Sequence, residues 1–217
     1  LKLAARRLFA ERGVDGVTTR EIVKAAGQKN QGSLNYYFGT KEALVKELVV
    51  DGAKLIDERR NAWLDELEAS DGLKSVRQIT DILVFSATRV SRGGAYREDS
   101  YNRFITLLAQ SHREMFEDAL QNKWNSGYQR CLNHLRVFLA DLPATVLSQR
   151  FIFLAAYLGS VLSIRERALF GNERTETMWA SDETLSHFSH TMSALLEAKY
   201  DDHSDQDIEK WRDQLDR

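Results

Sequence analysis

Proline and cysteine are nearly missing from this 217-residue chain, which has one of each, Pro143 and Cys131. A single cysteine excludes an intramolecular disulfide and a zinc site built from several cysteines, so we expect a reducing compartment. Because almost no proline interrupts long stretches rich in Leu, Ala, Glu, Lys and Arg, the composition predicts an all-α protein.

Long hydrophobic runs are also missing. The longest uncharged candidate covers residues 151–164 and has 14 residues between Arg150 and Arg165, whereas a membrane helix needs ~20. We therefore expect a buried helix in this region and no membrane partner. The chain begins within a helical pattern and shows no signal peptide, so the expected location is cytoplasmic.

Common enzyme motifs are absent from the sequence, which contains no HExxH, no glycine-rich phosphate loop and no GxSxG. Glu183, His187 and His190 fall on one face of a predicted helix and could hold a metal ion, but no fourth ligand is evident. A helical metal-binding enzyme is thus one alternative, and a solvated or dimer-flanking face is the plainer interpretation. We predict no catalytic residue, no metal and no cofactor.

Charge is distributed unevenly along the chain. Residues 1–47 carry nine Lys or Arg and five Asp or Glu, a balance of +4, and the remainder has a balance of −6. A basic head on an acidic body indicates that the head meets a polyanion.

Hydrophobic periodicity and glycine stops predict about nine or ten helices. Three short ones fall in residues 1–47, and longer ones are expected at 41–68, 75–91, 97–110, 114–140, 143–170 and 182–200. The predicted architecture is an N-terminal three-helix head with a helix-turn-helix (1–47), a larger helical domain (48–200) and an acidic tail with a short amphipathic helix (201–217).

The third short helix has an unusual outer side. On a helical wheel Leu34 and Phe38 lie within about 40° of each other and should face inward. The far side and its flanks carry small, polar and amphipathic residues: Gly32, Ser33, Asn35, Tyr36 and Tyr37. Such a helix after a glycine turn is typical of the recognition helix of a helix-turn-helix. The alternative is that the two tyrosines form a corner of the core.

Residues 8–27 (LFAERGVDGVTTREIVKAAG) and 32–44 (GSLNYYFGTKEAL) together resemble the tetracycline-repressor (TetR) family of bacterial transcription regulators. The resemblance covers about the first fifth of the chain. One departure is that four residues, 28–31, stand where the family usually has three. The extra residue lengthens the turn and is expected to change which side chains lead into the DNA groove.

The resemblance implies contacts with double-stranded operator DNA. Thr19 and Arg20 should touch the DNA backbone, and Tyr36, Tyr37 and Lys41 should contact phosphates. The candidates for contacts with base edges are Gln31, Ser33 and Asn35. Lys29, in the same segment, is also predicted to bind DNA. Arg20 and Lys41 could instead be ordinary solvated charges.

Dimerisation is expected because one helix-turn-helix reads few base pairs. In the family the last two long helices form a four-helix dimer bundle, so their apolar stripes are the predicted interface. The stripe residues are Leu154, Leu158, Leu162, Leu185, Phe188, Met192 and Leu195. The alternative is that these stripes face the core of their own chain.

The body is expected to hold a small-molecule effector whose binding moves the fourth helix and releases the operator, as in family repressors. The candidate pocket residues are Phe85, Arg89, Arg103, Phe104, His112, Trp124, Tyr128 and Tyr157. For each of them an ordinary core or surface position is the alternative. A second alternative is control by a protein partner, and a cavity of a few hundred Å³ would favour the small molecule.

Overall fold

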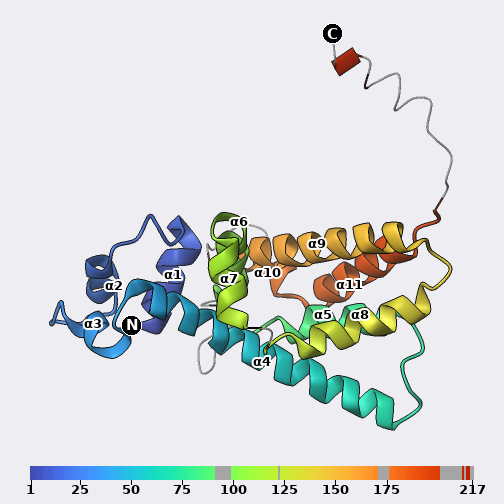
Figure 1. Cartoon of the computed structure of the whole chain (residues 1–217), viewed down its shortest axis with the longest axis horizontal. Coiled ribbons are helices and arrows are strands. Elements are labelled where there is room, and N and C mark those ends of the chain that lie inside the picture. Colours follow the sequence, from blue (N-terminus) through green and yellow to red (C-terminus); the bar gives the residue numbers. More distant parts are fainter. Residues whose placement is uncertain (91–98, 122, 171–175, 201–211, 213, 216–217) are drawn as a thin grey trace.

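The computed structural model describes residues 1–90, 99–121, 123–170, 176–200, 212 and 214–215. All regular secondary structure in this part of the chain is helical, which confirms the predicted fold class. The molecule is elongated, with a small head of three helices at one end and a larger helical body at the other (Figure 1). The predicted acidic tail lies almost wholly outside the described residues.

The head is built from three short helices around a small core. Thr18 caps the second helix: its hydroxyl accepts from the Glu21 amide at 3.3 Å, and the Glu21 carboxylate accepts from the Thr18 amide at 2.8 Å. Ile22 and Leu34 are fully buried and pack the second and third helices together. The helices are α1 (Lys2–Arg12), α2 (Thr19–Ala25) and α3 (Ser33–Phe38).

Helix α4 (Lys41–Ala69) connects the head to the body. Thr40 caps it by accepting a hydrogen bond from the Ala43 amide at 3.0 Å. Figure 1 shows α4 leaving the head and continuing along the whole body. Head and body therefore share one unbroken helix.

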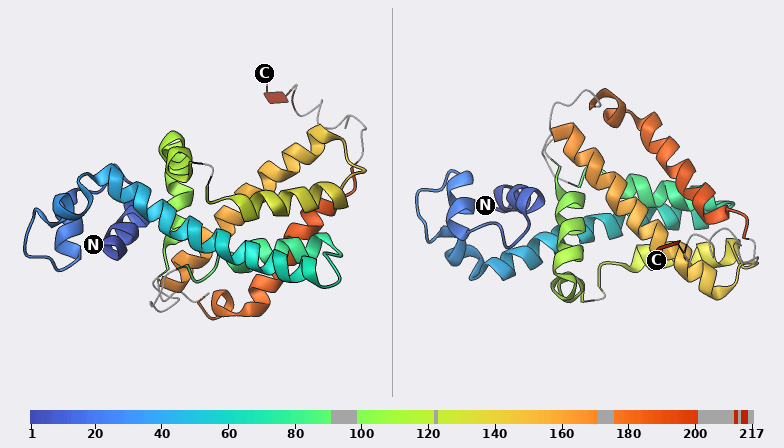
Figure 2. Two further views of the ribbon diagram at one scale, coloured as in Figure 1. Left: turned by 60° about the horizontal axis from the view of Figure 1, so that its bottom comes forward. Right: turned by 90° about the horizontal axis from the view of Figure 1, so that it is seen from above.

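Helices α5, α7 and α8 of the body pack against α4. Helix α6 lies between α1 and α9, and α11 packs on α5 and α9; the two views of Figure 2 show this arrangement. The helices are α5 (Val76–Ser86), α6 (Tyr101–Ser111), α7 (Arg113–Leu120), α8 (Ser126–Phe138), α9 (Ala144–Phe170), α10 (Glu176–Ala180) and α11 (Asp182–Glu197).

The single helix predicted over 114–140 is wrong, because two helices, α7 and α8, occupy that region. Gln121 ends α7 in a left-handed conformation, with φ 46°. The Asp57 carboxylate then holds the start of α8 by accepting from the Ser126 hydroxyl at 2.8 Å and the Gly127 amide at 2.7 Å. A β-carbon on Gly127 would lie 2.6 Å from Cβ of Arg60, so this glycine permits close packing on α4 and does not kink a helix.

Helix α9 is the one helix among the described residues that is long and apolar enough, by length and composition, to cross a membrane. Its charged residues argue for a place inside the body. Arg150 is buried and donates to the carbonyls of Leu196 and Ala198 at the C-terminal end of α11, and Glu166 is buried against the start of α6. These contacts tie α9 into the helical body.

Candidate nucleic-acid interface and internal cavity

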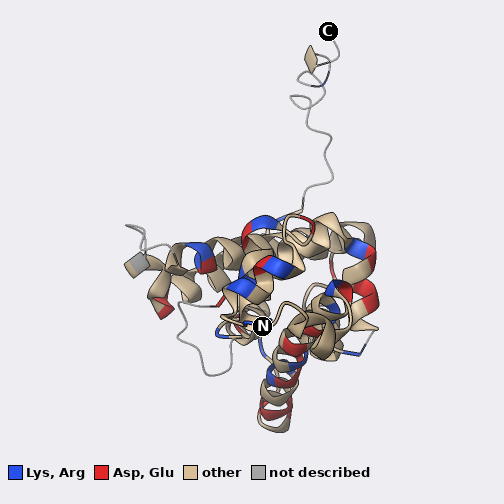
Figure 3. Ribbon diagram, turned by 90° about the vertical axis from the view of Figure 1, so that its left-hand side faces the viewer, with Lys and Arg blue, Asp and Glu red and all other residues tan. Residues whose placement is uncertain are grey.

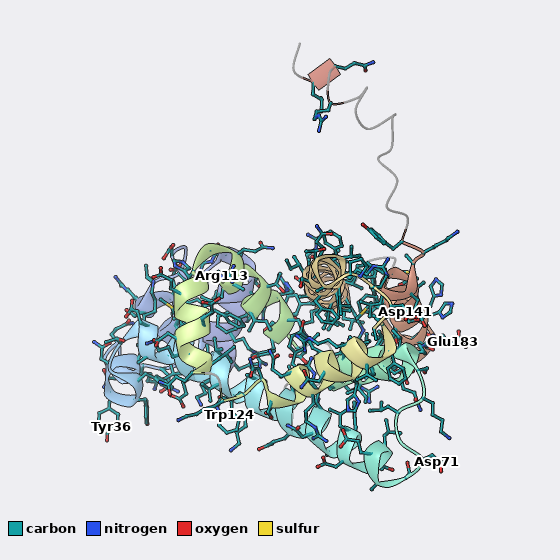
Figure 4. The ribbon with its side chains drawn as sticks, turned by 45° about the vertical axis from the view of Figure 1, so that its right-hand side comes forward. Tyr36, Asp71, Arg113, Trp124, Asp141 and Glu183 are labelled. Atoms are coloured by element: carbon teal, nitrogen blue, oxygen red, sulfur yellow. The ribbon has the colours of Figure 1, made fainter. Side chains whose placement is uncertain are left out.

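Two tyrosines stand out from the surface of the head. Tyr36 is 83% exposed and Tyr37 is 66% exposed, and their rings meet edge to face with centroids 5.1 Å apart. Tyr36 projects from the outer end of the head (Figure 4). Leu34 and the half-buried Phe38 anchor the other side of α3 in the core. The predicted orientation of the tyrosines is confirmed, and the core-corner alternative does not hold.

The basic residues of the head fall into two groups. Those on α1 are engaged: Lys2 with Glu47 and Asp51, Arg7 with Glu11, and Arg12 with Glu21 at 2.7 Å. By contrast, the exposed cations of α2 and the following turn have no ion-pair partner among the described residues. They are Arg20, Lys24 and Lys29.

Arg20 and Lys24 belong to α2, which contacts α3, and Lys29 lies in the turn that leads into α3. Arg20 and Lys24 are four residues apart and share one face of α2. Figure 3 views the molecule from this end with basic and acidic residues coloured. Thr19, Gln31 and Asn35 are also exposed. Lys24 was missed in the sequence, although its i+4 spacing from Arg20 was the signal that could have found it.

The outward orientation predicted for Ser33 is wrong. Its side chain is buried, at 7% exposure, and its hydroxyl donates to the Asn30 carbonyl at 2.7 Å. Helix α3 begins at Ser33, three residues after Asn30. The Asn30 side chain accepts from the Gly32 amide at 2.9 Å, so the longer turn closes on itself and draws Ser33 inward.

The prediction that Lys41 lies free for phosphate needs a similar correction. Its ammonium group donates to the carbonyls of Val14 at 3.1 Å and Val17 at 3.2 Å. These carbonyls belong to the connection between α1 and α2. In this structure Lys41 fastens the start of α4 to that connection.

The predicted dimer stripe lies mainly inside the chain. Helix α11 packs against α5, and α9 packs against α6 and α11, so the inner faces of both helices are filled by their own chain. The buried residues of that stripe are Leu154, Leu158, Leu162, Leu185, Phe188 and Met192, and Leu195 is partly buried. The interface prediction is wrong for the six buried residues, and for Leu195 it stays a prediction.

The outer face of α9 carries the exposed apolar groups instead. Phe153 is 56% exposed and Ile164 is 51% exposed. With Ser160 they lie within about 40° on a helical wheel. Ile152, at 66% exposure, flanks this face. Four residues thus form a mixed apolar and small surface, which we call the outer α9 face: Ile152, Phe153, Ser160 and Ile164.

A cavity of about 590 Å³ lies between α4, α6, α7, α8 and α9, and its lining includes exposed residues such as Gln110, Ala156 and, from the outer α9 face, Ser160. This volume is within the range of small-molecule sites. Its wall includes two of the predicted pocket residues, Trp124 and Tyr128, and Trp124 lies midway along the molecule (Figure 4). The wall also includes Tyr101 of α6 and Arg60 of α4, and sequence reasoning missed Arg60.

The other six predicted pocket residues do not line this cavity. Phe85 borders a separate shallow hollow beside α4, and Arg89 is exposed with Nη2 3.9 Å from Asp182. Tyr157 packs edge to face on Phe188 and joins α9 to α11. The pocket prediction is wrong for these three residues because helix packing, and not aromatic content, decides where space remains.

The last three of the predicted pocket residues, Arg103, Phe104 and His112, connect the head to the body. Phe104 is buried and stacks on Phe9 of α1, with ring centroids 6.0 Å apart. Arg103 donates to the Ala10 carbonyl at 3.4 Å, and His112 Nε2 lies 3.0 Å from the Asp15 carboxylate. Helix α6 thus contacts the head with these residues and lines the cavity with Tyr101 and its neighbours.

The alternative metal site does not assemble. In the described residues no group of three or more His, Cys, Asp or Glu is placed to hold a metal ion. Glu183, His187 and His190 are all exposed on α11.

Comparison with known proteins points to one kind of protein. Residues 3–48 match the family model described as bacterial regulatory proteins, tetR family. A search of curated proteins gives no match. The chain resembles the solved structure of a putative tetR family transcription regulator from Shewanella sp. PV-4, with 17% identity, a TM-score of 0.56 and coverage of 88% of this chain and 94% of that chain.

Two further solved structures share the fold. The TetR family transcriptional regulator PfmR from Thermus thermophilus is 11% identical, with a TM-score of 0.56, over 92% of this chain and 98% of that chain. A transcriptional regulator from Rhodococcus sp. Rha1 is 16% identical, with a TM-score of 0.51, over 90% and 94%. At these identities the likeness concerns the fold.

Proposed function

We infer that this chain, whose N-terminal domain is of the TetR family and whose body has the fold of that family's solved members, is a homodimeric, sequence-specific DNA-binding regulator. It represses transcription and leaves its operator when a small-molecule effector binds. The solved relatives are described as transcription regulators, which supports a role without catalysis. Such a regulator works in the cytoplasm, where it meets DNA.

The observation that carries the proposal is the surface of α3 and its surroundings. Tyr36 and Tyr37 expose large rings to solvent on a six-residue helix, and an exposed aromatic cluster rimmed by polar groups marks an interaction site. Arg20, Lys24 and Lys29 lie beside it. Phenol hydroxyls and cations together suit phosphate oxygens, and the exposed amides of Gln31 and Asn35 are the proposed contacts to base edges.

Dimerisation is proposed through the outer α9 face. Two recognition helices must be held about one DNA turn apart to bind both halves of an operator. An exposed face with Ile152, Phe153 and Ile164 is disfavoured in an isolated chain and is covered by a second copy in the four-helix arrangement of the family. The exposed side of α11, with His187 and His190, would flank that contact.

Effector control is proposed through the cavity. Its volume of about 590 Å³ favours a small molecule over a protein partner, since a protein partner needs no hollow body. The wall includes residues of α4, which carries the head, and of α6, which contacts the head through Phe104 and His112. A ligand that changes the spacing of these two helices would favour a different head position.

Measurement of DNA binding at several salt concentrations tests the proposal. The full chain should shift its own upstream DNA fragment in a gel and protect a roughly palindromic site in a footprint. Arg20→Gln and Lys24→Gln should each reduce the slope of log K against log salt, by about 0.9 for each lost phosphate contact and so about 2 for a dimer.

Lys74→Gln is a matched control, because Lys74 is an exposed cation near Asp71, at the end of the molecule away from the head (Figure 4). It should leave the slope unchanged. A protein that binds no duplex at low salt, or three variants that behave alike, would refute the proposed interface.

A further inference from the structure

One cation faces the apolar cavity. Arg60 of α4 is the only charged side chain among the described residues that line it. Its Nε donates to the Ser86 hydroxyl at 3.0 Å, and its Cζ lies 5.6 Å from the centre of the Tyr128 ring. The two terminal nitrogens of the guanidinium have no hydrogen-bond or ion-pair partner in the described part of the chain.

The nearest acidic residue on the same helix is already engaged. Asp57 lies three positions before Arg60 and is buried, and its carboxylate accepts from Ser126 and from the Gly127 amide. It therefore serves the start of α8. Loss of water around Arg60 lowers the pKa of its guanidinium, and the nearby Asp57 charge, which acts in the opposite direction, offsets this only in part.

The remaining wall is mainly apolar. Side chains from the surrounding helices contribute large hydrophobic surfaces: Ile56, Ile105, Phe116, Trp124 and Leu158. A ligand that only filled this space would leave the Arg60 cation desolvated and unpaired, which is unfavourable. A ligand with one negative charge at the Arg60 end would satisfy both parts of the wall.

We propose that the cavity binds an amphipathic monocarboxylate, whose carboxylate is held by the terminal nitrogens of Arg60 and whose apolar body packs on the aromatic and aliphatic wall. Arginine suits this role because its planar guanidinium can donate two parallel hydrogen bonds to one carboxylate. The inference rests on the proposed function, in which this cavity is the effector site, and it names the effector's chemical class.

Isothermal titration of the full chain, without DNA, tests the proposal. The probes are decanoate and 2-naphthoate, each beside its neutral alcohol, decanol or 2-naphthol, and beside decylamine as a cation. At least one carboxylate should bind at least about 10-fold more tightly than its alcohol, and decylamine should not bind. Charge-assisted hydrogen bonds to a buried group have this strength.

Variants of α4 make the test specific. Arg60→Gln should weaken carboxylate binding about 10- to 100-fold and leave alcohol binding unchanged, while Arg60→Lys should keep part of the preference. Lys54→Gln removes the same charge from the same helix, at a residue whose ammonium lies outside the cavity wall, 5.4 Å from the Trp124 ring centre. It should bind carboxylates like the unaltered chain.

The inference is overturned if both alcohols bind as tightly as their acids, if neither carboxylate binds at millimolar concentration, or if a folded Arg60→Gln retains the preference. If Arg60→Gln does not fold, two measurements still test the proposal: the comparison of each carboxylate with its alcohol, and carboxylate binding by Arg60→Lys. A gel shift separates the two proposals. Normal operator binding without carboxylate binding refutes this inference alone, and carboxylate binding by a chain that shifts no DNA refutes the regulatory function alone.

Discussion

The ring of Tyr101 lies directly on Gly52. A β-carbon built on Gly52 would be 2.1 Å from Cε2 of the tyrosine, and only the absence of a side chain lets the Tyr101 ring approach α4 this closely. The Tyr101 hydroxyl donates to the Val49 carbonyl of α4 at 2.8 Å. Because Tyr101 also lines the cavity, one side chain connects the cavity wall to the helix that carries the head.

Gly52→Ala should be destabilising, because the new methyl group overlaps the Tyr101 ring and the two helices must separate. We expect the free energy of unfolding to fall by about 1–3 kcal/mol, measured by urea unfolding. Tyr101→Leu should relieve part of this loss in the double variant. Strict additivity of the two changes would contradict the contact.

Tyr101→Phe should keep the ring and lose only the hydrogen bond to Val49. We expect about 1 kcal/mol less stability and a smaller change in DNA affinity when the cavity is filled. Tyr128→Phe is the control, since that hydroxyl lines the same cavity without a hydrogen-bond partner among the described residues. If both variants lose equal stability, the Val49 contact is not important.

In the head, Ser33 and Gln31 should behave differently although they are two residues apart. Ser33→Ala removes the buried hydrogen bond to Asn30, so it should lower thermal stability and weaken binding to cognate and random DNA alike. Gln31→Ala should leave stability within about 0.5 kcal/mol and change the preferred bases. Binding-site selection with both variants checks this, and a change of base preference by Ser33→Ala alone would reverse the assignment.

Phe153→Glu should convert a dimer to a monomer, because it places a charge in the outer α9 face. Val137→Glu is the control, since Val137 of α8 is 74% exposed and lies outside that face. Sedimentation at micromolar concentration should find a monomer for the first variant and a dimer for the second. A dimer for both would place the interface elsewhere.

Stability should depend on the protonation of Glu166. Burial, with the nearby Asp99 charge, raises the pKa of this carboxyl from 4.5 to about 7. A carboxyl with a raised pKa in the folded protein takes up a proton on folding, so stability falls as pH rises through that range. From pH 6 to pH 8 we expect a loss of about 1 kcal/mol.

Glu166→Gln should flatten that pH dependence in urea unfolding. The amide carbonyl can still accept from Asn102, which donates to Glu166 through its backbone at 3.0 Å and its side chain at 2.8 Å. An unchanged slope between pH 6 and pH 8 would show that another group is responsible.

The sequence predicted local structure well wherever short-range chemistry decides it. The inward Leu34 and the outward tyrosines both depend on residues a few positions apart. Ser33 was mispredicted because its orientation depends on how the longer turn closes through Asn30. A helical wheel treats every residue as part of the helix, whereas α3 begins only at Ser33.

The cavity and the connection between head and body depend on which helices meet, and periodicity alone does not contain that information. Phe104 and His112 were assigned to the pocket because they are aromatic or polar, yet they face α1 and its following turn. Gly52 gave no signal as a contact residue, although its missing side chain makes room for the Tyr101 ring on α4. The dimer interface was mispredicted for the same reason, because the sequence of an apolar helix face does not show whether a helix of the same chain or of a second copy covers it.

The continuity of α4 has a mechanical consequence. From Arg60 to Lys41 the helix rises about 28 Å, and no proline or glycine break intervenes other than the packed Gly52. A tilt of about 5° at Arg60 would therefore carry Lys41 sideways by about 2.5 Å, nearly the length of a hydrogen bond. Helix α4 can act as a lever, so a ligand that displaces Arg60 only slightly would still misalign the tyrosines with their phosphates.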